Sequence, residues 1–375
     1  MRTVSKTVIG VDFGTQSARA VLVNAENGEI IYSCRKQYPY NSTPVPAIDC
    51  AENLPCATDY EMTLYELLRN VIPEEYRKTV AGICIDATSL TMVLLAEDGR
   101  ALSELDGWSE AAHARVKLWK YHRAQEKADE ALNLASNLQE PFLGRTGGSI
   151  SCEWMLPKLL EVRDEAPEIY SKIDLAMDLC EFLTFRLTGQ LVRSIGSLSY
   201  KCLWAEDLSF PERTFLNGLR AGFYEEYCHF LRGDVRKPGE CAGMLRSELT
   251  KRWGLPEQIP VATGMLDGHT SLATMGAFEP GDAALIVGTS NVCTVQDRKL
   301  QELKDVCGVA QDGMVTGSCG IDTGQSSTGN MLGWFVEHMA GWQIHREAEE
   351  RKISPHQVLA ERIQKPWENK VIAVD

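Results

Sequence analysis

The sequence predicts an α/β protein with more than one domain. Runs rich in Val and Ile, such as 7–13 and 80–86, alternate along the chain with runs whose apolar residues recur at helical spacing, such as 58–71. The length of 375 residues exceeds what one simple core usually fills, so we expect two domains. Gly-Thr turns at Gly14 and Gly288 each lie between two strands, which favours a duplicated domain that clamps a ligand; chance is the alternative, because Gly-Thr is a common dipeptide.

The first third of the chain predicts three hairpin-connected strands followed by alternating elements. Gly14-Thr15 and Asn27-Gly28 supply the tight turns that a β-meander needs. Beyond them, helical spacing gives way to buried strands that end in turn residues. The expected elements are strands at 7–13, 18–24 and 29–36, a helix at 58–71, and strands at 80–86 and 92–96.

Helical patterns dominate the middle of the chain, and strands return near its end. A short strand leads into the segment 264–269, where we expect a helix to begin. Residues 370–374 start a further strand with no closing element, so we expect a chain that has been cut. The expected helices are 111–134, 151–161, 176–187 and 211–231, and the expected strands are 258–262, 283–287 and 293–295.

The amino-acid composition and net charge argue against some classes of binding partner. The formal net charge of -14 argues against a nucleic acid or an anionic membrane, because both require a basic surface. It leaves an anionic ligand such as ATP open, since backbone N–H groups and a magnesium ion can hold phosphates in an acidic protein. The 12 cysteines form no C-x-x-C pair, and there is no apolar leader or membrane-length apolar run, so we expect a soluble cytoplasmic protein.

The turn after the first strand is a candidate phosphate and metal site. Glycine at Gly14 lets the backbone approach a phosphate closely, and the Thr15 hydroxyl can bind phosphate oxygens. Asp12 at the end of the strand can hold hydrated magnesium, which needs few protein carboxylates. The alternative is an ordinary hairpin in which the aspartate serves the turn.

Asp267 is a candidate catalytic base. It follows a strand and precedes Gly268 and a predicted helix, a position that directs a carboxylate into a crevice at the strand ends. A kinase needs such a group to orient the attacking hydroxyl and accept its proton. The alternative is that Asp267 caps the helix. Asp86 could bind a sugar hydroxyl or cap a loop, and the cluster Trp119–His122 could bind a polyhydroxylated ligand or form an amphipathic surface. The sequence contains no Walker-type phosphate loop and no dinucleotide-binding glycine fingerprint.

Taken together, these segments resemble the FGGY carbohydrate kinases. Four segments lie in the family's order across nearly the whole chain, which is far more specific than any one of them. Segment 9–20 resembles the first phosphate motif, 264–269 the catalytic-aspartate motif, 287–290 the second phosphate hairpin, and 324–326 also fits. Within the family the chain is similar to ribulokinases, which use a Trp-Lys-x-His segment like 118–124 and a lysine segment like 200–204.

The resemblance implies a fold, a reaction and a set of site residues. The fold is a duplicated actin-like, ribonuclease-H-like ATPase, with a sugar-binding domain at 1–278 and a partial nucleotide-binding domain at 279–375. The reaction is ATP-dependent phosphorylation of ribulose at its terminal hydroxyl, a step of arabinose catabolism. The implied residues are Asp267 as base, Asp12 for Mg²⁺, Ala87, Lys120, His122, Lys201 and Asp322 for the sugar, and Gly14, Thr15, Gln16, Gly288 and Thr289 for phosphates.

Several departures from the family pattern leave alternatives open. Asp322 stands where ribulokinases usually have Glu, and Cys180-Glu181-Phe182 replaces the usual Asp-Trp pair. The family's adenine-binding glycine motif would lie beyond Asp375, so the second domain is expected to be incomplete. The alternatives are a kinase for another sugar or polyol and a non-catalytic sugar-binding remnant. A homodimer, or a partner chain that completes the second domain, also stays open.

Overall fold

The computed structural model describes residues 5–38, 54–288, 291–325 and 328–362. The chain divides into two units, each of which is described by itself. The first unit comprises residues 1–284 and 293–323, and the second comprises 285–292 and 324–375.

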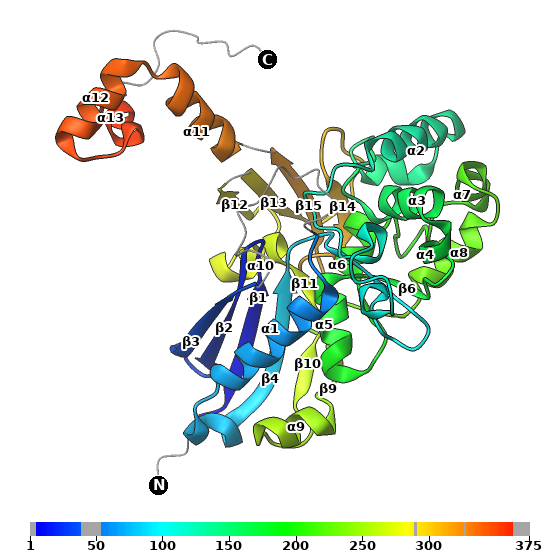
Figure 1. Cartoon of the computed structure of the whole chain (residues 1–375), viewed down its shortest axis with the longest axis horizontal. Helices are drawn as coiled ribbons and strands as arrows, with labels where there is room; N and C mark the ends of the chain where they lie inside the picture. Colours follow the sequence, from blue (N-terminus) through cyan, green and yellow to red (C-terminus); the bar gives the residue numbers. More distant parts are fainter. Residues whose placement is uncertain (1–4, 39–53, 289–290, 326–327, 363–375) are drawn as a thin grey trace. The chain divides into compact units, whose positions relative to one another are not determined.

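The first unit is built on a mixed seven-stranded sheet with the order β3-β2-β1-β4-β10-β9, in which β11 also pairs with β4 (Figure 1). β1, β2 and β3 are antiparallel, whereas β4 runs parallel to β1, and β10 and β11 run parallel to β4. The strands are β1 (Thr7–Phe13), β2 (Ser17–Asn24), β3 (Ile30–Gln37), β4 (Val80–Ala87), β9 (Cys241–Met244), β10 (Pro260–Ala262) and β11 (Met265–Leu266).

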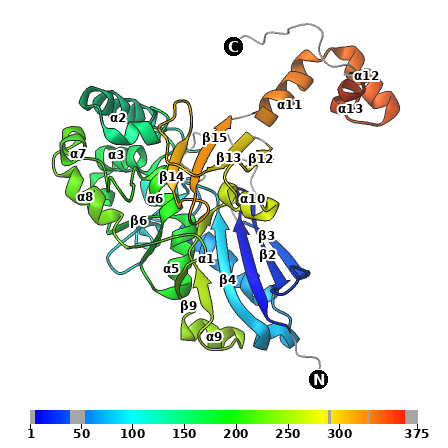
Figure 2. The ribbon, with the colours of Figure 1, turned by 180° about the vertical axis from the view of Figure 1, so that it is seen from behind.

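Helices α1 (Ala57–Asn70) and α5 (Leu179–Thr188) touch each other and pack on this sheet. Alternate residues of β1 are buried, including Ile9, Val11 and Phe13, as expected for a strand with one face in the core. Leu64 and Leu68 of α1 are completely buried at a helical spacing of four. Figure 2 shows β2, β1 and β4 side by side from the opposite side. The core therefore fixes the sheet whose strand ends carry the predicted site.

A helical layer with its own hydrophobic core adjoins the sheet within the first unit. Contacts link α2 with α3 and α7, and α7 with α8, in the green part of the ribbon (Figure 1). Two short strand pairs, β5 with β6 and β7 with β8, complete this region. Its elements are β5 (Met92–Leu95), β6 (Leu175–Asp178), β7 (Val192–Ser194), β8 (Asp234–Arg236), α2 (Gln125–Leu138), α3 (Met155–Glu165), α4 (Pro167–Tyr170), α6 (Ile195–Lys201), α7 (Arg213–Leu219) and α8 (Phe223–Phe230). The first unit also contains α9 (Ser247–Trp253), which contributes Leu249 and Trp253 to the core of the main sheet, and α10 (Asp267–Met275).

A second sheet has the strand order β12-β13-β15-β14. Its strands are β12 (Ala283–Val287), β13 (Asn291–Asp297), β14 (Gly308–Gln311) and β15 (Cys319–Gln325), and β14 pairs antiparallel with β15. The second unit adds helices α11 (Thr328–Met339), α12 (Trp342–Arg351) and α13 (Pro355–Arg362). Short 3-10 helices lie at Glu74–Thr79, Leu102–Glu104, Ala112–Ala114 and Pro141–Arg145. Across the parts of the chain that the structure describes, no helix is long and apolar enough to span a bilayer.

Three predicted helices are corrected by the structure. Residues 115–124 are not helical, because the backbone of Lys117 pairs with Met92 instead of forming helical hydrogen bonds. The predicted helix 176–187 begins as strand β6, and its helical part starts only after the capping box formed by Asp178 and Glu181. The predicted helix 211–231 is split at Gly222, whose φ of 76° lies in the left-handed region. The expected strand at 370–374 lies outside the described residues.

Candidate active site

Three aspartates lie together at one edge of the main sheet. In the parallel pairing of β1 with β4, Asp12 stands opposite Asp86. In the pairing of β11 with β4, Met265 stands opposite Asp86 and Leu266 opposite Ala87, so Asp267 follows at the same edge. Parallel strands end on the same side of a sheet, and ligands bind in the crevice outside those ends. The topology thus brings residues more than 250 positions apart into one site.

Asp86 is the most perturbed carboxyl of this cluster. Burial raises its pKa to about 8, repulsion from Asp12 and Asp267 adds to the shift, and a hydrogen bond from Thr270 opposes it. At neutral pH, Asp86 is therefore protonated and shares a hydrogen bond with Asp12. A divalent cation would relieve this crowding of like charges. The cluster offers two neighbouring carboxylates for such an ion, and no group of three or more metal-binding side chains converges anywhere in the described residues.

Asp267 is the first residue of α10, and the residue before it, Leu266, occupies the cap position. The cap interpretation of Asp267 is therefore wrong. Burial raises the pKa of Asp267 to about 6, backbone N–H groups of Gly268 and Ser89 hold the shift back, and repulsion from Asp12 adds to it. The Gly268 N–H lies 2.7 Å from Oδ1 of Asp267. A carboxylate with a pKa near 6 is ionised at neutral pH and is well matched to accept a proton there.

The Gly-Thr turn between β1 and β2 lies next to this cluster in sequence and is held by side chains from elsewhere. The N–H of Gly14 donates to Ser17 at 3.1 Å, and the Tyr38 hydroxyl donates to the Gly14 carbonyl at 2.9 Å. The indole N–H of Trp119 donates to the Thr15 hydroxyl at 3.1 Å. With its acceptor position engaged, the Thr15 hydroxyl is oriented to donate its own proton, as a phosphate oxygen requires.

A buried ion pair lies at the end of α6. Lys201 Nζ is 3.2 Å from Oδ2 of Asp322, and His269 Nε2 is 3.6 Å from the same oxygen. Burial by itself would raise the pKa of Asp322, but the positive charge of Lys201 and a hydrogen bond from His269 outweigh it and hold the pKa well below its usual range. Burial would likewise lower the pKa of Lys201, but attraction to Asp322 raises it. Both groups are charged at neutral pH.

Tyr200 fixes this pair in place. Its ring lies edge-on to His269 with centroids 4.7 Å apart, and its hydroxyl donates to the carbonyl of Gly320 at 2.8 Å. A Cβ atom at Gly308, Gly313 or Gly320 would lie 2.5–2.6 Å from an atom of the Tyr200 side chain. These glycines are therefore required by the close approach of α6 to β14 and β15.

Electrostatic interactions connect these groups with one another. The charge of Lys201 lowers the pKa of Asp267. The charge of Glu153 raises the pKa of Lys201, and Glu153 in turn accepts a hydrogen bond from His122 at 2.8 Å. His122 is half exposed, and burial lowers the pKa of Lys120. The structure thus gathers the carboxylate cluster, the ion pair and the 119–122 segment within the first unit.

Comparison with known proteins identifies the family. The model of the FGGY family of carbohydrate kinases, N-terminal domain, matches residues 7–274. The chain belongs to the FGGY family of carbohydrate kinases. A ribulokinase from Halalkalibacterium halodurans is 32% identical over 99% of this chain and 68% of its own length. A ribulokinase from Mycolicibacterium smegmatis is 34% identical with the same coverage. The predicted family, and with it the enzyme class of an ATP-dependent carbohydrate kinase, is confirmed.

Solved structures confirm the predicted fold. A ligand-bound xylulose kinase from Lactobacillus acidophilus has a TM-score of 0.72 at 18% identity, over 96% of this chain and 66% of its own. A glycerol kinase from Plasmodium falciparum with ADP has a TM-score of 0.71 at 14% identity, over 90% of this chain and 64% of its own. The chain therefore spans about two thirds of the length of these FGGY kinases.

Most of the predicted site residues lie in the first unit of this FGGY kinase chain. Ala87 is buried at the end of β4, and Gln16 is exposed beside Thr15. Gly288 belongs to the second unit, and Thr289 lies outside the described residues. Sequence reasoning missed His269 and Glu153. Both residues lie in segments that resemble the family, His269 in the catalytic-aspartate motif 264–269 and Glu153 in the segment 151–154, which also fits the ribulokinase pattern, but neither was given a role.

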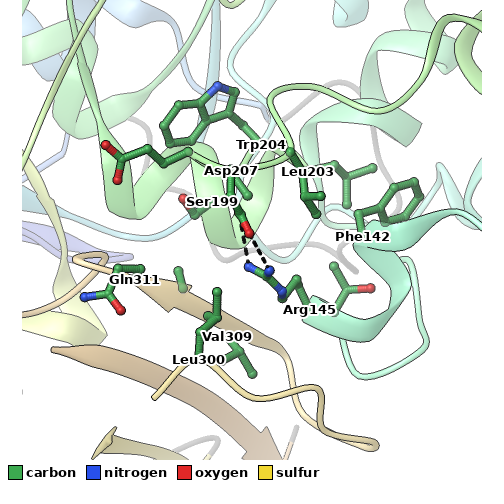
Figure 3. Close-up of a pocket in the computed structure, with 14 residues that line it drawn as sticks. Phe142, Arg145, Ser199, Leu203, Trp204, Asp207, Leu300, Val309 and Gln311 are labelled. Atoms are coloured by element: carbon green, nitrogen blue, oxygen red, sulfur yellow. Dashed lines mark hydrogen bonds and ion pairs between the residues drawn. The ribbon is translucent and has the colours of Figure 1, made fainter. Parts of the chain in front are cut away.

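A separate pocket of about 330 Å³ is lined by residues of α6, the loop after it and β14 (Figure 3). Its walls are largely apolar, with Phe142 and Leu203 facing Val309 across it. At its rim, Arg145 pairs with Asp207, with Nη2 and Oδ2 2.8 Å apart. Ser199 lines this pocket, and it lies on the same helix as Lys201. None of the residues predicted from the sequence to bind sugar or ATP lines it.

Proposed function

We propose that this chain carries the sugar-binding and catalytic part of a ketopentose kinase that transfers the γ-phosphoryl group of ATP to the terminal hydroxyl of ribulose. The observation that carries the proposal is the buried Asp267, with a pKa near neutrality, within electrostatic reach of the buried Lys201–Asp322 pair. Asp267 suits proton transfer, and the Lys201–Asp322 pair suits recognition of a polyhydroxylated ligand. Ribulokinases that are 32–34% identical support ribulose as the sugar.

The charged pair would bind the sugar by hydrogen bonds. Lys201 Nζ donates one bond to Asp322 and has further protons for hydroxyl or carbonyl oxygens of a ketose. Asp322 can accept hydrogen bonds from sugar hydroxyls, as could the Glu that ribulokinases usually have at this position. The replacement of Glu by Asp therefore changes how far the carboxylate reaches and not its chemistry. Lys120 and His122 would contribute from the other side of the site, and Ala87 would provide an apolar contact. A buried site of this kind rejects a ligand that lacks a matching hydroxyl, because its polar groups are then left unpaired.

The turn at Gly14–Gln16 would bind phosphate oxygens through its backbone N–H groups and the Thr15 hydroxyl. Asp12 and Asp86 fit a magnesium ion, because they offer two neighbouring carboxyl groups whose mutual repulsion, added to burial, raises the pKa of Asp86. When bound, Mg²⁺ would offset the negative charge of the ATP phosphates. Gly288 and Thr289 are proposed to contribute a second phosphate-binding turn.

Asp267 would act as the general base. The terminal hydroxyl oxygen of the sugar forms a bond to the γ-phosphorus, the bond from that phosphorus to the bridging oxygen of ADP breaks, and the hydroxyl proton passes to Asp267. Lys201, through its charge, keeps Asp267 ionised before the transfer. Exclusion of water by domain closure would suppress ATP hydrolysis. The domain boundary at 278/279, a cytoplasmic location and a homodimer or a completing partner chain stay predictions.

The test compares wild type with Asp267→Asn, which keeps the size of the side chain but cannot accept the proton. Titration calorimetry with L-ribulose and with Mg-ATP measures binding, and ADP release measures turnover. We expect both ligands to bind and Asp267→Asn to lower kcat by about 10²–10⁴-fold with little change in sugar affinity. Turnover that survives this substitution would refute the role of Asp267.

The alternative outcome is a sugar-binding domain without turnover. Binding of ribulose without Mg-ATP would establish that alternative. A preference for another ketose or a polyol in the same titration would refute ribulose but keep the kinase assignment. The Lys120→Met and His122→Ala variants then show whether the 119–122 segment selects the sugar.

A further inference from the structure

A fully buried lysine of α3 joins two segments of the proposed site. Lys158 is 0% exposed. Its ammonium donates to the carbonyl of Leu90 at 2.8 Å and to the carbonyl of Leu118 at 2.9 Å, with a longer contact of 3.4 Å to the carbonyl of Lys117. Burial lowers the pKa of Lys158 to about 7, so at neutral pH its ammonium form, which can donate to all three carbonyl oxygens, exists beside the neutral amine, which can donate to two. The carbonyls of Lys117 and Leu118 also accept the backbone N–H groups of Met92 and Tyr121. In the described hydrogen bonds the Leu90 carbonyl accepts from Lys158, and burying it without that donor would be costly.

The first anchored segment is the loop after β4. Leu90 has a φ of 55°, which is unusual for a residue other than glycine and persists only where its surroundings hold it. Its N–H donates to Oδ2 of Asp178 at 2.8 Å while its carbonyl accepts from Lys158. The residue before it, Ser89, donates its backbone N–H to Asp267. Leu90 is therefore held on both sides directly beside a hydrogen bond to the proposed base.

The second anchored segment precedes the Thr15 contact. Leu118 accepts from Lys158, and the next residue, Trp119, donates its indole N–H to the Thr15 hydroxyl in the predicted phosphate turn. Lys120, a predicted sugar contact, follows. One ammonium thus links the backbone that leads to the base with the backbone that leads to the phosphate turn and the sugar contacts.

We propose that Lys158 is a positioning residue that holds the loop 88–91 and the segment 118–120 in the relative placement that sugar binding and phosphoryl transfer require. This inference rests on the proposed function above. A simpler role, filling space in the helical core, does not account for an ammonium at this position, because an apolar side chain of similar length would pack there without the cost of burying a charge. The hydrogen bonds from Lys158 to three carbonyl oxygens explain why an ammonium is buried at this position.

Lys117 offers a matched control, because it is also 0% exposed and lies in the same region. Its ammonium pairs with Glu161 at 3.4 Å and makes no contact with Leu90 or Leu118 in the described hydrogen bonds. Lys158→Met removes one buried ammonium. The Lys117→Met control removes the other and always carries Glu161→Gln as well, because Lys117→Met alone would leave the buried Glu161 carboxylate unpaired. Lys158→Gln keeps two N–H donors and serves as a milder variant if Lys158→Met does not fold.

Hydrogen-exchange mass spectrometry of the ligand-free chain tests the anchoring without relying on activity. We expect the amides of residues 88–91 to exchange about tenfold faster in Lys158→Met, and less so in Lys158→Gln, because Leu90 loses one of its two anchors. In Lys117→Met these amides should exchange as in wild type. Equal acceleration by the two methionine variants, or none by Lys158→Met, would overturn the proposal and leave Lys158 a core residue.

The functional consequence is measured by sugar titration and, where the chain turns over, by kinetics. Lys158→Met should weaken ribulose binding about tenfold and lower kcat/KM by about 10²-fold, the scale expected for small misplacements of reacting groups. Lys117→Met should remain within about threefold of wild type. If wild type binds no sugar, the proposed function fails, yet the exchange contrast still decides whether Lys158 anchors the loop. Faster exchange with unchanged sugar affinity would overturn the positioning role.

Discussion

Removing the lysine of the buried Lys201–Asp322 pair should destabilise the first unit strongly. The two side chains are only 11% and 9% exposed, and their charged atoms are 3.2 Å apart. At an effective dielectric constant of about 20, such a pair attracts by about 5 kcal/mol, and breaking a buried pair typically costs about 3–5 kcal/mol because one charge is left alone. We therefore expect Lys201→Met to lower the free energy of unfolding by about 3–5 kcal/mol at neutral pH.

The pH dependence of this loss has a definite sign. In wild type, the depressed pKa of Asp322 adds stability that is fully present above the unfolded value near 4 and is lost as pH falls below it. In Lys201→Met the main charge that depressed the pKa is gone, and we expect burial, now opposed by His269 without the lysine, to raise it. The unfolded chain would release the Asp322 proton first, so the variant should lose stability as pH rises from 4 to 8, by at most about 1.4 kcal/mol per pH unit.

Urea denaturation followed by tryptophan fluorescence at pH 5 and pH 8 measures these free energies. Lys201→Met with Asp322→Leu should recover most of the loss, because an apolar pair can replace a buried ion pair. Lys237→Met is the control, since Lys237 is 37% exposed and pairs with Asp312 at 2.7 Å, so its loss should cost about 1 kcal/mol or less. Additive losses in the double variant, or a Lys201→Met cost no larger than the control, would refute the reasoning.

Three further predictions follow from other contacts. Hydrogen bonding from Arg220 lowers the pKa of Asp164 to about 2, so this pair should add stability above about pH 4 that disappears toward pH 2, and Arg220→Met should flatten that part of an acid titration of unfolding. Trp119→Phe removes the N–H that orients the Thr15 hydroxyl, so calorimetry should show Mg-ATP binding about 5- to 10-fold weaker with ribulose binding unchanged. Chelation of Mg²⁺ should abolish ATP binding but spare the sugar, and ATP affinity that survives chelation would contradict the roles of Asp12 and Asp86.

The sequence predicted the main sheet well because its strands follow local rules. Strand 7–13 was predicted to the residue, since its alternating Val and Ile residues and the turn at Gly14 act within a few positions. The helix at Asp267 was also predicted from local signals. The segment 115–124 was mistaken for helix because its backbone partner, Met92, lies 25 positions before Lys117. Such a long-range pairing overrides local propensity and leaves no nearby signal.

In the candidate site, too, residues with local sequence signals were predictable and residues that depend on long-range contacts were not. Asp12 and Asp267 were predictable because each follows a strand and adjoins glycine, a pattern that resembles family motifs. Asp86 remained undecided between sugar contact and loop cap, because only its register opposite Asp12 shows that it belongs to the cluster. Lys158 carried no signal at all, because its partners are backbone carbonyls, which every residue possesses. Positioning residues that act on the backbone are therefore the part of a site that side-chain patterns do not predict.

The cluster of carboxylates at one edge of the main sheet bears on how this acidic chain could bind ATP. A chain with net charge -14 that gathers Asp12, Asp86 and Asp267 at one sheet edge should repel a polyanion such as ATP. Burial, together with repulsion from Asp12 and Asp267, raises the pKa of Asp86 to about 8. A divalent ion would let Asp86 ionise, lower the local charge and leave Asp267 as the carboxylate free to take a proton. The acidic cluster and an anionic substrate are thus compatible through a cation, and Asp267, which is already ionised at neutral pH, remains the carboxylate that can take the sugar proton.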